Sequence, residues 1–352
     1  PRSTHCISSA ASDVYKRQAL GKANFSEPPS LWLVTQAAMP VALPNSDAKG
    51  QLPIINIAQS PLWGMGKVIA LEHPELNCVR IDLDPEMKGD EAQALFEEIH
   101  LNSQEDQIAF RQNARYVPRL VHYQNKKAFD QVDSFFHADS TYLITGGLGG
   151  LGLQVANWMV EQGAKHLVLV GRSGAKAAVH NQLEALEQTG ATIRILKSDV
   201  SQAKQVAQVL AEIEQSLPPL RGIIHAAGVL NDGVLMNQTW KRFSQVFAPK
   251  VQGAWNLHAL TSHLSLDFSV LFSSVSALLG SKAQANHAAA NSFLDALAFY
   301  RQAQGLPGLS INWGTWSEIG AAAQRGADEQ LKQKGIAPVS YTHLTLPTIC
   351  SV

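Results

Sequence analysis

The chain has 352 residues, of which 45% are hydrophobic and 16% are charged, so it can bury a sizeable core and is long enough for two globular units. A formal net charge of −1 offers no electrostatic basis for binding nucleic acid or an anionic membrane. The three cysteines are far apart and form neither a metal motif nor a disulfide framework, and no apolar run is long enough to cross a bilayer. We therefore expect a cytoplasmic protein without a metal site.

Both ends of the chain differ in character from the rest. Residues 1–18 show no periodicity that joins them to the following segment, and both they and residues 339–352 resemble translated adapter sequence. We predict that these ends are non-native and leave them out of the fold. A native disordered arm and tail are the alternative, because chain termini are commonly disordered.

Residues 19–122 are predicted to form a first α/β unit, followed by a polar linker over 123–139. The expected elements are a strand, a helix, a strand and a helix, at Leu31–Thr35, Leu62–Leu71, Cys78–Leu83 and Glu91–Ile99. Strand, helix and strand in succession predict a parallel pair. No glycine-rich turn follows Thr35, and Gly64 and Gly66 lie inside the helical pattern, where packing accounts for them. This unit is predicted to be related to nucleotide-binding folds without itself holding a nucleotide site.

A glycine-rich turn marks the start of a second unit, predicted over residues 140–338. The apolar strand Thr141–Thr145 runs into this turn, and a helix with apolar periodicity follows it. Gly146, Gly149 and Gly152 would let the backbone turn tightly, approach a pyrophosphate and pack the helix closely. The pattern predicts a dinucleotide site, with a purely structural glycine loop as the alternative.

The strand–helix alternation continues through this second unit and predicts a doubly wound parallel sheet. Its further strands are expected at His166–Val170, Ile193–Leu196, Gly222–His225, Phe268–Phe272 and Leu309–Trp313. Ligands of such sheets lie at the carboxyl ends of the strands. The residues expected to contact the cofactor there are Thr145, Gly146, Gly147, Leu148, Gly149, Gly150, Leu151, Gly152, Arg172, Ser173, Asp199, Val200, Ala226, Ala227 and Gly228. His225 is interpreted as structural.

Arg172 follows the second strand at the place where an acidic residue would bind the ribose of NAD. A guanidinium there favours the 2′-phosphate of NADPH, and Ser173 can add a hydroxyl; an ordinary exposed arginine is the alternative. Asp199 follows the third strand, where its carboxylate can accept a hydrogen bond from the adenine amino group. Its alternative role is the N-cap of a helix that begins near Ser201.

Several segments of the chain resemble the ketoreductase domain of type I modular polyketide synthases, a branch of the short-chain dehydrogenase/reductase superfamily. They are Thr141–Gly152, His225–Gly233, Pro249–His258, Leu271–Ser274, Ala288–Leu297 and Ser310–Trp316. The resemblance implies two Rossmann-like units, the first a cofactor-free structural subdomain. It also implies NADPH-dependent reduction of a β-ketoacyl chain, which a phosphopantetheine arm holds on an acyl carrier protein among neighbouring synthase domains.

The resemblance assigns catalytic roles to four positions. Ser274 matches the serine that binds the developing oxyanion, Lys250 the lysine that lowers the pKa of the proton donor, and Asn291 the residue that holds this lysine and a water. Residues 287 and 291 would share one side of a helix. A solvated lysine is the alternative for Lys250.

The sequence departs from the family at the proton donor, where His287 replaces tyrosine. An unperturbed imidazole has a pKa of about 6.5, and we expect the charge of Lys250 to lower it. The reach of the ring is also shorter than that of a phenol. We therefore predict weak or absent turnover with cofactor binding retained. A naturally inactive domain, a domain that tolerates histidine and a sequencing error are the three explanations.

The segment Leu230–Asp232 resembles the Leu-Asp-Asp signature of B-type ketoreductases, with Asn231 in place of the middle aspartate, and the tryptophan of A-type domains is absent at Leu279. The resemblance implies a D-configured, (3R) product; a turn cap beside Gly233 is the alternative role of Asp232. Past residues 335–338 the family continues with a helix and a strand that we do not find. A catalytically inactive scaffold of the synthase and an animal-type fatty acid synthase reductase are the competing functions.

Overall fold

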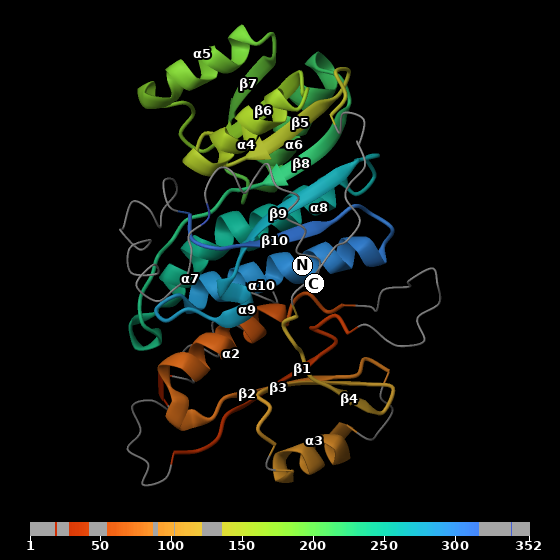
Figure 1. The fold of residues 1–352 in the computed structure, drawn as a ribbon, viewed down its shortest axis with the longest axis vertical. Coiled ribbons are helices and arrows are strands. Elements are labelled where there is room, and N and C mark those ends of the chain that lie inside the picture. Colours follow the sequence, from red (N-terminus) through yellow and green to blue (C-terminus); the bar gives the residue numbers. More distant parts are fainter. Residues whose placement is uncertain are drawn as a thin grey trace. The chain divides into compact units, whose positions relative to one another are not determined.

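The structure, a computed structural model of the chain, describes residues 18–19, 28–41, 55–86, 91–101, 103–121, 136–316 and 339. The chain forms two compact units, and each draws on segments that are distant in the sequence (Figure 1). Unit 1 consists of Pro1–Val121, Asn231–Phe247 and Ser273–Gly308, and unit 2 of His122–Leu230, Ala248–Phe272 and Leu309–Val352. Most of the two predicted non-native ends, most of the predicted linker and residues 335–338 lie outside the described residues.

Unit 1 contains a four-stranded sheet in the order β1-β2-β3-β4. Its elements are β1 (Trp32–Gln36), α2 (Ser60–Glu72), η1 (Pro74–Leu76), β2 (Val79–Leu83), α3 (Glu91–His100), β3 (Gln107–Arg111) and β4 (Ala114–Tyr116). The predicted parallel pairing of the first two strands is confirmed, with Trp32 opposite Val79. β3 adds in parallel to β2, and β4 returns antiparallel to β3.

Asp82, a fully buried residue of β2, fills the turn that follows β1. Its carboxylate accepts hydrogen bonds from the Thr35 hydroxyl (2.6 Å), the Ala38 N–H (2.8 Å) and the Met39 N–H (3.1 Å). Arg111 forms an ion pair with the same carboxylate. In nucleotide-binding units the N–H groups after the first strand bind phosphate. An internal carboxylate takes that place here, so the turn is satisfied without glycines or a ligand.

Later segments of the chain supply further helices to unit 1, namely η3 (Leu235–Asn237), α7 (Trp240–Phe247), α9 (Ser276–Leu279) and α10 (Ala285–Ala303). α10 packs along α2, as Figure 1 shows in blue and orange. Gly64 permits this approach, because a Cβ there would stand 2.3 Å from the Ala288 carbonyl oxygen. A Cβ at Gly66 would meet the Arg80 side chain at 2.7 Å. Both glycines serve packing, as the sequence predicted.

Unit 2 is built on a six-stranded sheet in the order β10-β9-β8-β5-β6-β7. The strands are β5 (Thr141–Thr145), β6 (His166–Gly171), β7 (Thr192–Lys197), β8 (Leu220–His225), β9 (Phe268–Ser274) and β10 (Leu309–Trp313). The helices are α4 (Gly150–Glu161), η2 (Ala177–Val179), α5 (His180–Gln188), α6 (Ala203–Ser216), η4 (Ala248–Gln252) and α8 (Gly253–Thr261). From β7 to β9 each strand is parallel to its neighbour, and the order reverses at β5. The doubly wound prediction is confirmed.

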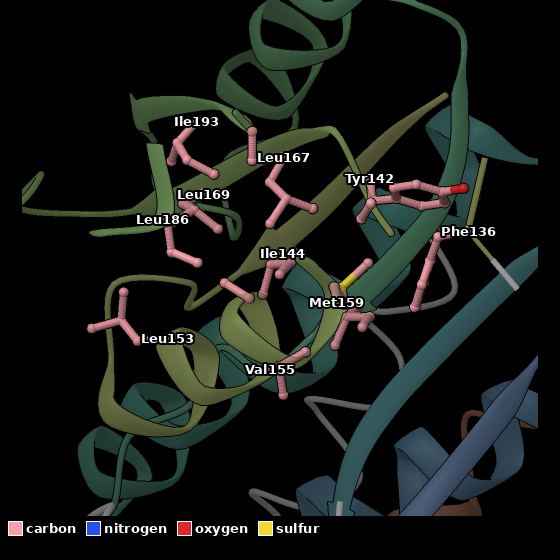
Figure 2. Packing of buried hydrophobic residues seen from close by; sticks show 14 of the residues in the cluster. Phe136, Tyr142, Ile144, Leu153, Val155, Met159, Leu167, Leu169, Leu186 and Ile193 are labelled. Atoms are coloured by element: carbon pink, nitrogen blue, oxygen red, sulfur yellow. The ribbon is translucent and has the colours of Figure 1, made fainter. Parts of the chain in front are cut away.

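The core of unit 2 lies on both faces of this sheet, because alternate residues of each strand point to opposite faces. On one face Tyr142 and Ile144 pack with Met159 of α4 (Figure 2). The Tyr142 ring stacks on Phe268 and meets Phe136 edge-on, and its hydroxyl accepts a hydrogen bond from the His137 N–H (2.7 Å). Phe136 thus extends the core into the end of the predicted linker. None of the helices that can be described has the length and hydropathy to cross a bilayer.

Candidate functional site

The glycine-rich turn between β5 and α4 is closed by backbone contacts that exclude side chains. Gly146 has a φ of +71°, and a Cβ there would stand 2.8 Å from the backbone of Ala226 and Ala227 at the end of β8. A Cβ at Gly152 would stand 2.3 Å from the Gly146 carbonyl oxygen. The first glycine therefore makes the turn and the third packs the helix against it, which are the roles that the spacing predicted.

Gly149 differs from these two glycines, because it is exposed and extended, with a φ of −84° and a ψ of 163°. It is the N-cap of α4, and among the described residues no side chain caps this N-terminus. The first N–H groups of a helix carry a partial positive charge and bind anions. The turn thus fits the pyrophosphate of a dinucleotide: it leaves helix N–H donors accessible beside a residue whose missing side chain allows close approach.

Arg172 and Ser173 are exposed and follow β6 directly, where the sequence places the ribose of the cofactor. Asp199 follows β7, and its Oδ1 accepts hydrogen bonds from the N–H (3.0 Å) and hydroxyl (2.8 Å) of Ser201. α6 begins two residues later than predicted, with Gln202 as its N-cap. Asp199 is therefore not the N-cap; it orders the turn that precedes the helix.

Lys250 lies on a single turn of π-helix (η4), and its side chain is buried, with the residue only 7% exposed. Its Nζ donates a hydrogen bond to the Phe272 carbonyl oxygen (2.8 Å). A Cβ at Gly228 would stand 3.1 Å from Lys250 Cε, so the glycine makes room for this side chain. The alternative of a solvated lysine is wrong. π-Helical turns are rare and often occur at functional sites.

His225 is buried at the end of β8 and hydrogen-bonds through Nδ1 to the Thr145 hydroxyl (2.7 Å). Burial, together with the positive charge of Lys250, lowers the pKa of His225 to about 3, and the backbone of Pro249 and Lys250 opposes this shift. The imidazole is thus neutral at physiological pH and joins two neighbouring strands of the sheet. This agrees with its interpretation as a structural residue.

Ser273 and Ser274 end β9 and differ in their contacts. Ser273 is buried, and its hydroxyl donates to the Asn291 carbonyl oxygen (3.2 Å) in α10. Ser274 is half-buried, and its Oγ accepts a hydrogen bond from the Ser276 N–H (3.2 Å). The Ser276 hydroxyl also lies 3.0 Å from the Ser274 Oγ. The Ser276 contacts hold the Ser274 side chain at the turn into α9, while Ser273 serves packing.

The first turns of α10 carry the other two predicted catalytic positions. Asn291 Nδ2 donates to the His287 carbonyl oxygen (2.9 Å), so the two residues share one side of the helix, as the spacing predicted. The His287 N–H donates to Oδ1 of Asn286 (2.7 Å), and the His287 side chain is half-buried. Nearby, the Asp232 carboxylate accepts a hydrogen bond from Gln284 (3.3 Å), just before the helix begins.

Sequence reasoning missed the residues that hold the loop around Asp232. Asn286 is fully buried and donates to the Asn231 carbonyl oxygen (2.8 Å) and to Oε1 of Gln238 (3.3 Å). Gln18, the last residue of the predicted non-native arm, donates to three carbonyl groups of the same loop, those of Leu235 (3.1 Å), Met236 (3.3 Å) and Gln238 (2.7 Å). The only sequence feature that pointed to Asn286 was its position next to the family-like segment Ala288–Leu297. No sequence feature pointed to Gln18.

The predicted site residues are thus divided between the two compact units. The cofactor turn, the residues after β6, β7 and β8, and Lys250 belong to unit 2. Asp232, Ser274, His287 and Asn291 belong to unit 1, together with the N-terminal sheet. Within unit 1 the structure brings Asp232 near the start of α10, and within unit 2 it brings the glycine-rich turn next to Ala226 and Ala227.

Comparison with solved structures shows the same fold. "Structure of A-type Ketoreductases from Modular Polyketide Synthase" superposes with a TM-score of 0.83 at 35% identity, covering 94% of this chain and 68% of that one. The ketoreductase from the first module of phoslactomycin biosynthesis in Streptomyces sp. HK803 has a TM-score of 0.83 at 30% identity, covering 95% and 74%.

Curated relatives are much longer proteins. A 6-methylsalicylic acid synthase of Arthrobotrys oligospora is 36% identical over 332 residues, which are 90% of this chain and 18% of that protein. A phenolphthiocerol/phthiocerol polyketide synthase of Mycobacterium tuberculosis is 38% identical over 300 residues, 84% of this chain and 16% of that one. The chain therefore spans less than a fifth of the length of these relatives.

Two family models match the chain in succession. The Rossmann fold domain of the polyketide synthase extender module SpnB matches residues 8–120, and the KR domain matches residues 140–318. The second match covers more than half of the chain and carries the glycine-rich turn, Lys250, Ser274 and the first turns of α10. The chain belongs to the ketoreductase domains of type I modular polyketide synthases, within the short-chain dehydrogenase/reductase superfamily.

Proposed function

We propose that the chain binds NADPH and reduces the β-ketone of an acyl thioester carried by an acyl carrier protein, with turnover limited by His287. The observation that carries the proposal is Lys250: its amino group is buried on a π-helical turn, beside Gly228 at the carboxyl end of the central strands. Burying a lysine costs free energy unless its charge has a partner or a function. In the chemistry of this family the charge acts beside the proton donor.

The nicotinamide cofactor supplies the hydride when it is bound. The N-terminus of α4 would hold its pyrophosphate, and the exposed Gly149 would let the phosphates approach the backbone. Arg172 would pair with the 2′-phosphate, which distinguishes NADPH from NADH by one charged group. Asp199 keeps one carboxylate oxygen engaged by Ser201, so its proposed contact with the adenine amino group would use the other oxygen.

The chain's own residues would stabilise the oxyanion that develops on the substrate carbonyl. Ser274 would donate its hydroxyl hydrogen to that oxygen, because its Oγ is held by accepting from the Ser276 N–H. Lys250 would supply positive charge beside the proton donor. Asn291, fixed by its bond to the His287 carbonyl oxygen, would hold the lysine and a water in place.

His287 would be the proton donor and the weak member of this set. A neutral imidazole has a single N–H, and this N–H is a poor acid. General acid catalysis contributes about 10²- to 10⁴-fold in rate. Because a misplacement of about 1 Å can itself cost about 100-fold in rate, we expect His287 to forfeit most of that factor. The domain would then bind its cofactor and turn over slowly.

The proposed product is the D-configured, (3R) β-hydroxyacyl chain. This proposal rests on Asp232 within Leu230–Asp232 and on Leu279, where A-type domains carry tryptophan. The solved structure named above as A-type is 35% identical to this chain, and that name describes it and not this chain. The proposed setting is the cytoplasm, with the neighbouring domains of a synthase as partners.

A second candidate function is an inactive scaffold domain that binds NADPH without reducing a substrate. The observation that favours it is again His287, because the rest of the site keeps residues of the active family. Both functions predict cofactor binding. They differ only in turnover, so a measurement of turnover separates them.

The test is NADPH consumption with a β-ketoacyl thioester mimic, comparing the present chain with its His287→Tyr and His287→Phe variants. We expect His287→Tyr to accelerate turnover about 10²-fold or more, because it restores a phenolic donor. His287→Phe fills similar space without an acidic proton and is expected to show no turnover.

Equal turnover of the present chain and the His287→Tyr variant would show that histidine is a working acid. Binding of NADPH without turnover in any of the three proteins would support the scaffold function instead. Absence of NADPH binding in all three would contradict both functions.

A further inference from the structure

Glu72, the last residue of α2, binds two loops that lie far from it in the sequence. Its Oε2 accepts a hydrogen bond from the Leu235 N–H and its Oε1 one from the Ala283 N–H, both at 2.6 Å. Hydrogen bonds to an ionised carboxylate are shorter and stronger than neutral ones. One side chain of the N-terminal sheet-and-helix segment therefore joins two loops that are 163 and 211 residues away in the chain.

These two loops carry residues of the proposed site. Leu235 follows Asp232 by three residues, and Ala283 precedes His287 by four. The loops also bind one another, because the Gly233 N–H donates to the Ala283 carbonyl oxygen (2.7 Å) and Gln284 donates to the Asp232 carboxylate (3.3 Å). Glu72 thus binds at the junction between the loop of the proposed stereocontrol residue and the loop that leads into the proposed proton donor.

The backbone at this junction adopts a conformation that needs support. Ala283 has a φ of +67°, a left-handed conformation that residues other than glycine rarely adopt. Both of its backbone polar groups are used, the N–H by Glu72 and the carbonyl by Gly233. Unfavourable backbone conformations persist where surrounding contacts determine them, and they concentrate at functional sites. The Glu72 carboxylate is the charged member of the contacts that hold Ala283.

A second residue of α2 holds the other end of the same loop. Lys67 is buried, and its Nζ donates to the Ala277 carbonyl oxygen (2.7 Å) in α9. Gly280 lies against the backbone of Lys67, because a Cβ there would stand 3.2 Å from the Lys67 carbonyl. The segment between Ser274 and His287 is therefore fastened to α2 at both ends, by a cation at Ala277 and by an anion at Ala283.

We propose that Glu72 is a positioning residue that sets the place of the Asp232 loop relative to the start of α10, and thereby the facial selectivity of carbonyl reduction. The inference rests on the proposed reductase function. It gives the N-terminal segment a part in specificity, because the hydrogen bonds come from its helix α2 to loops that the KR family model covers.

The variant that tests this role is Glu72→Gln. Glutamine keeps the size of the side chain but offers one oxygen acceptor, and its NH₂ group faces an N–H donor with which it cannot hydrogen-bond. The matched control is Glu75→Gln, which removes the same charge three residues later, where the carboxylate is exposed and pairs with His73. Glu72→Asp keeps both acceptor oxygens on a side chain that is shorter by one methylene.

Two measurements report on positioning. The first is amide hydrogen exchange of Leu235 and Ala283 in the chain as it stands, which needs no turnover. The second is the ratio of (3R) to (3S) product, with kcat and KM for a β-ketoacyl thioester mimic, in the His287→Tyr background. For Glu72→Gln we expect protection of at least one of the two amides to fall about tenfold, the (3S) fraction to rise and NADPH affinity to stay unchanged.

We expect Glu75→Gln to change none of these quantities, and Glu72→Asp to recover part of the protection and selectivity. Unchanged protection at both amides in a folded Glu72→Gln protein would overturn the inference, as would an unchanged product ratio despite lost protection. If Glu72→Gln does not fold, the same comparison is made with Glu72→Asp, where unaltered exchange and selectivity would count against it. If no His287→Tyr protein reduces the mimic, the proposed function fails, while the exchange data still decide whether Glu72 positions the two loops.

Discussion

Gly149 and Gly152 lie three residues apart in the cofactor turn, yet a methyl group at each would meet different surroundings. At Gly152 it would stand 2.3 Å from the Gly146 carbonyl oxygen, so Gly152→Ala must displace backbone. We expect a loss of about 1–3 kcal/mol in the free energy of unfolding, as for other overpacked sites. Denaturant unfolding monitored by circular dichroism measures it.

Gly149→Ala is the matched substitution for the cofactor. A Cβ at position 149 would stand 3.3 Å from the nearest protein atom, and any residue adopts the φ of −84° found there. We expect stability to change little and NADPH affinity to fall about tenfold or more, because the methyl group would face the phosphates. Equal effects of the two substitutions on stability would contradict the separate roles of the two glycines.

Arg172 allows a second test at the residue scale. Removing a charge-assisted hydrogen bond costs about 1.5–3 kcal/mol, so we expect Arg172→Ala to weaken NADPH binding roughly 10- to 100-fold. NADH lacks the 2′-phosphate, and its affinity should not change. Cofactor fluorescence titration measures both affinities.

Arg194→Ala is the control for Arg172→Ala, because Arg194 is an exposed arginine within the neighbouring strand β7. We expect it to leave both affinities as they are. If Arg172→Ala weakened the binding of NADPH and NADH equally, the guanidinium would not be recognising the 2′-phosphate.

At the scale of elements, one buried ion pair joins β2 to β3, between Asp82 and Arg111. Asp82 is fully buried, and Asp82→Asn would leave the Arg111 guanidinium without its counter-charge. Breaking a buried pair by neutralising one partner costs about 3–5 kcal/mol, and we expect a loss of this size in the stability of unit 1. Thermal unfolding and urea titration both measure it.

The exposed pair between Arg119 and Glu105 is the control for this experiment. Glu105→Gln is expected to leave the unfolding transition within experimental error, because water screens exposed pairs. A comparably small effect of Asp82→Asn would show that the turn after β1 is held by its backbone alone.

The chain as a whole is expected to lose stability in acid through His225. The unfolded imidazole binds a proton near pH 6.5, whereas the native one binds it only near pH 3. Between these values the unfolded state holds more protons, so the free energy of unfolding falls as the pH falls, by at most about 1.4 kcal/mol per pH unit from this group. The contribution is fully present above pH 6.5 and is lost as the pH approaches 3.

Urea unfolding at pH 7, 6, 5 and 4 measures this dependence, with His225→Gln and His180→Gln as the variants. His180 is exposed in α5 and has no comparable burial. We expect the slope of stability against pH to flatten for His225→Gln alone. Parallel slopes for all three proteins would mean that other groups cause the acid sensitivity.

Much of the fold could be predicted because its signals are local. The strand expected at Leu309–Trp313 is found with the same bounds, and the helix expected at Leu62–Leu71 is found as Ser60–Glu72. Alternating or helical hydrophobic periodicity and glycine breaks act within a few residues, so they can be recognised without knowledge of distant contacts. The glycine-rich turn was predictable for the same reason, since its sequence pattern lies within one strand, one turn and one helix.

The sequence by itself therefore determined the α/β class, the doubly wound sheet and the pattern of the cofactor turn. The tertiary structure alone decided that α10 packs on α2, that Asp82 closes the turn after β1, and that Lys250 is buried. It also decided that Glu72 binds Leu235 and Ala283, across 163 and 211 residues of chain. A hydrogen bond between residues so far apart produces no periodicity and no short motif in the sequence, because its two partners become neighbours only when separate elements pack together.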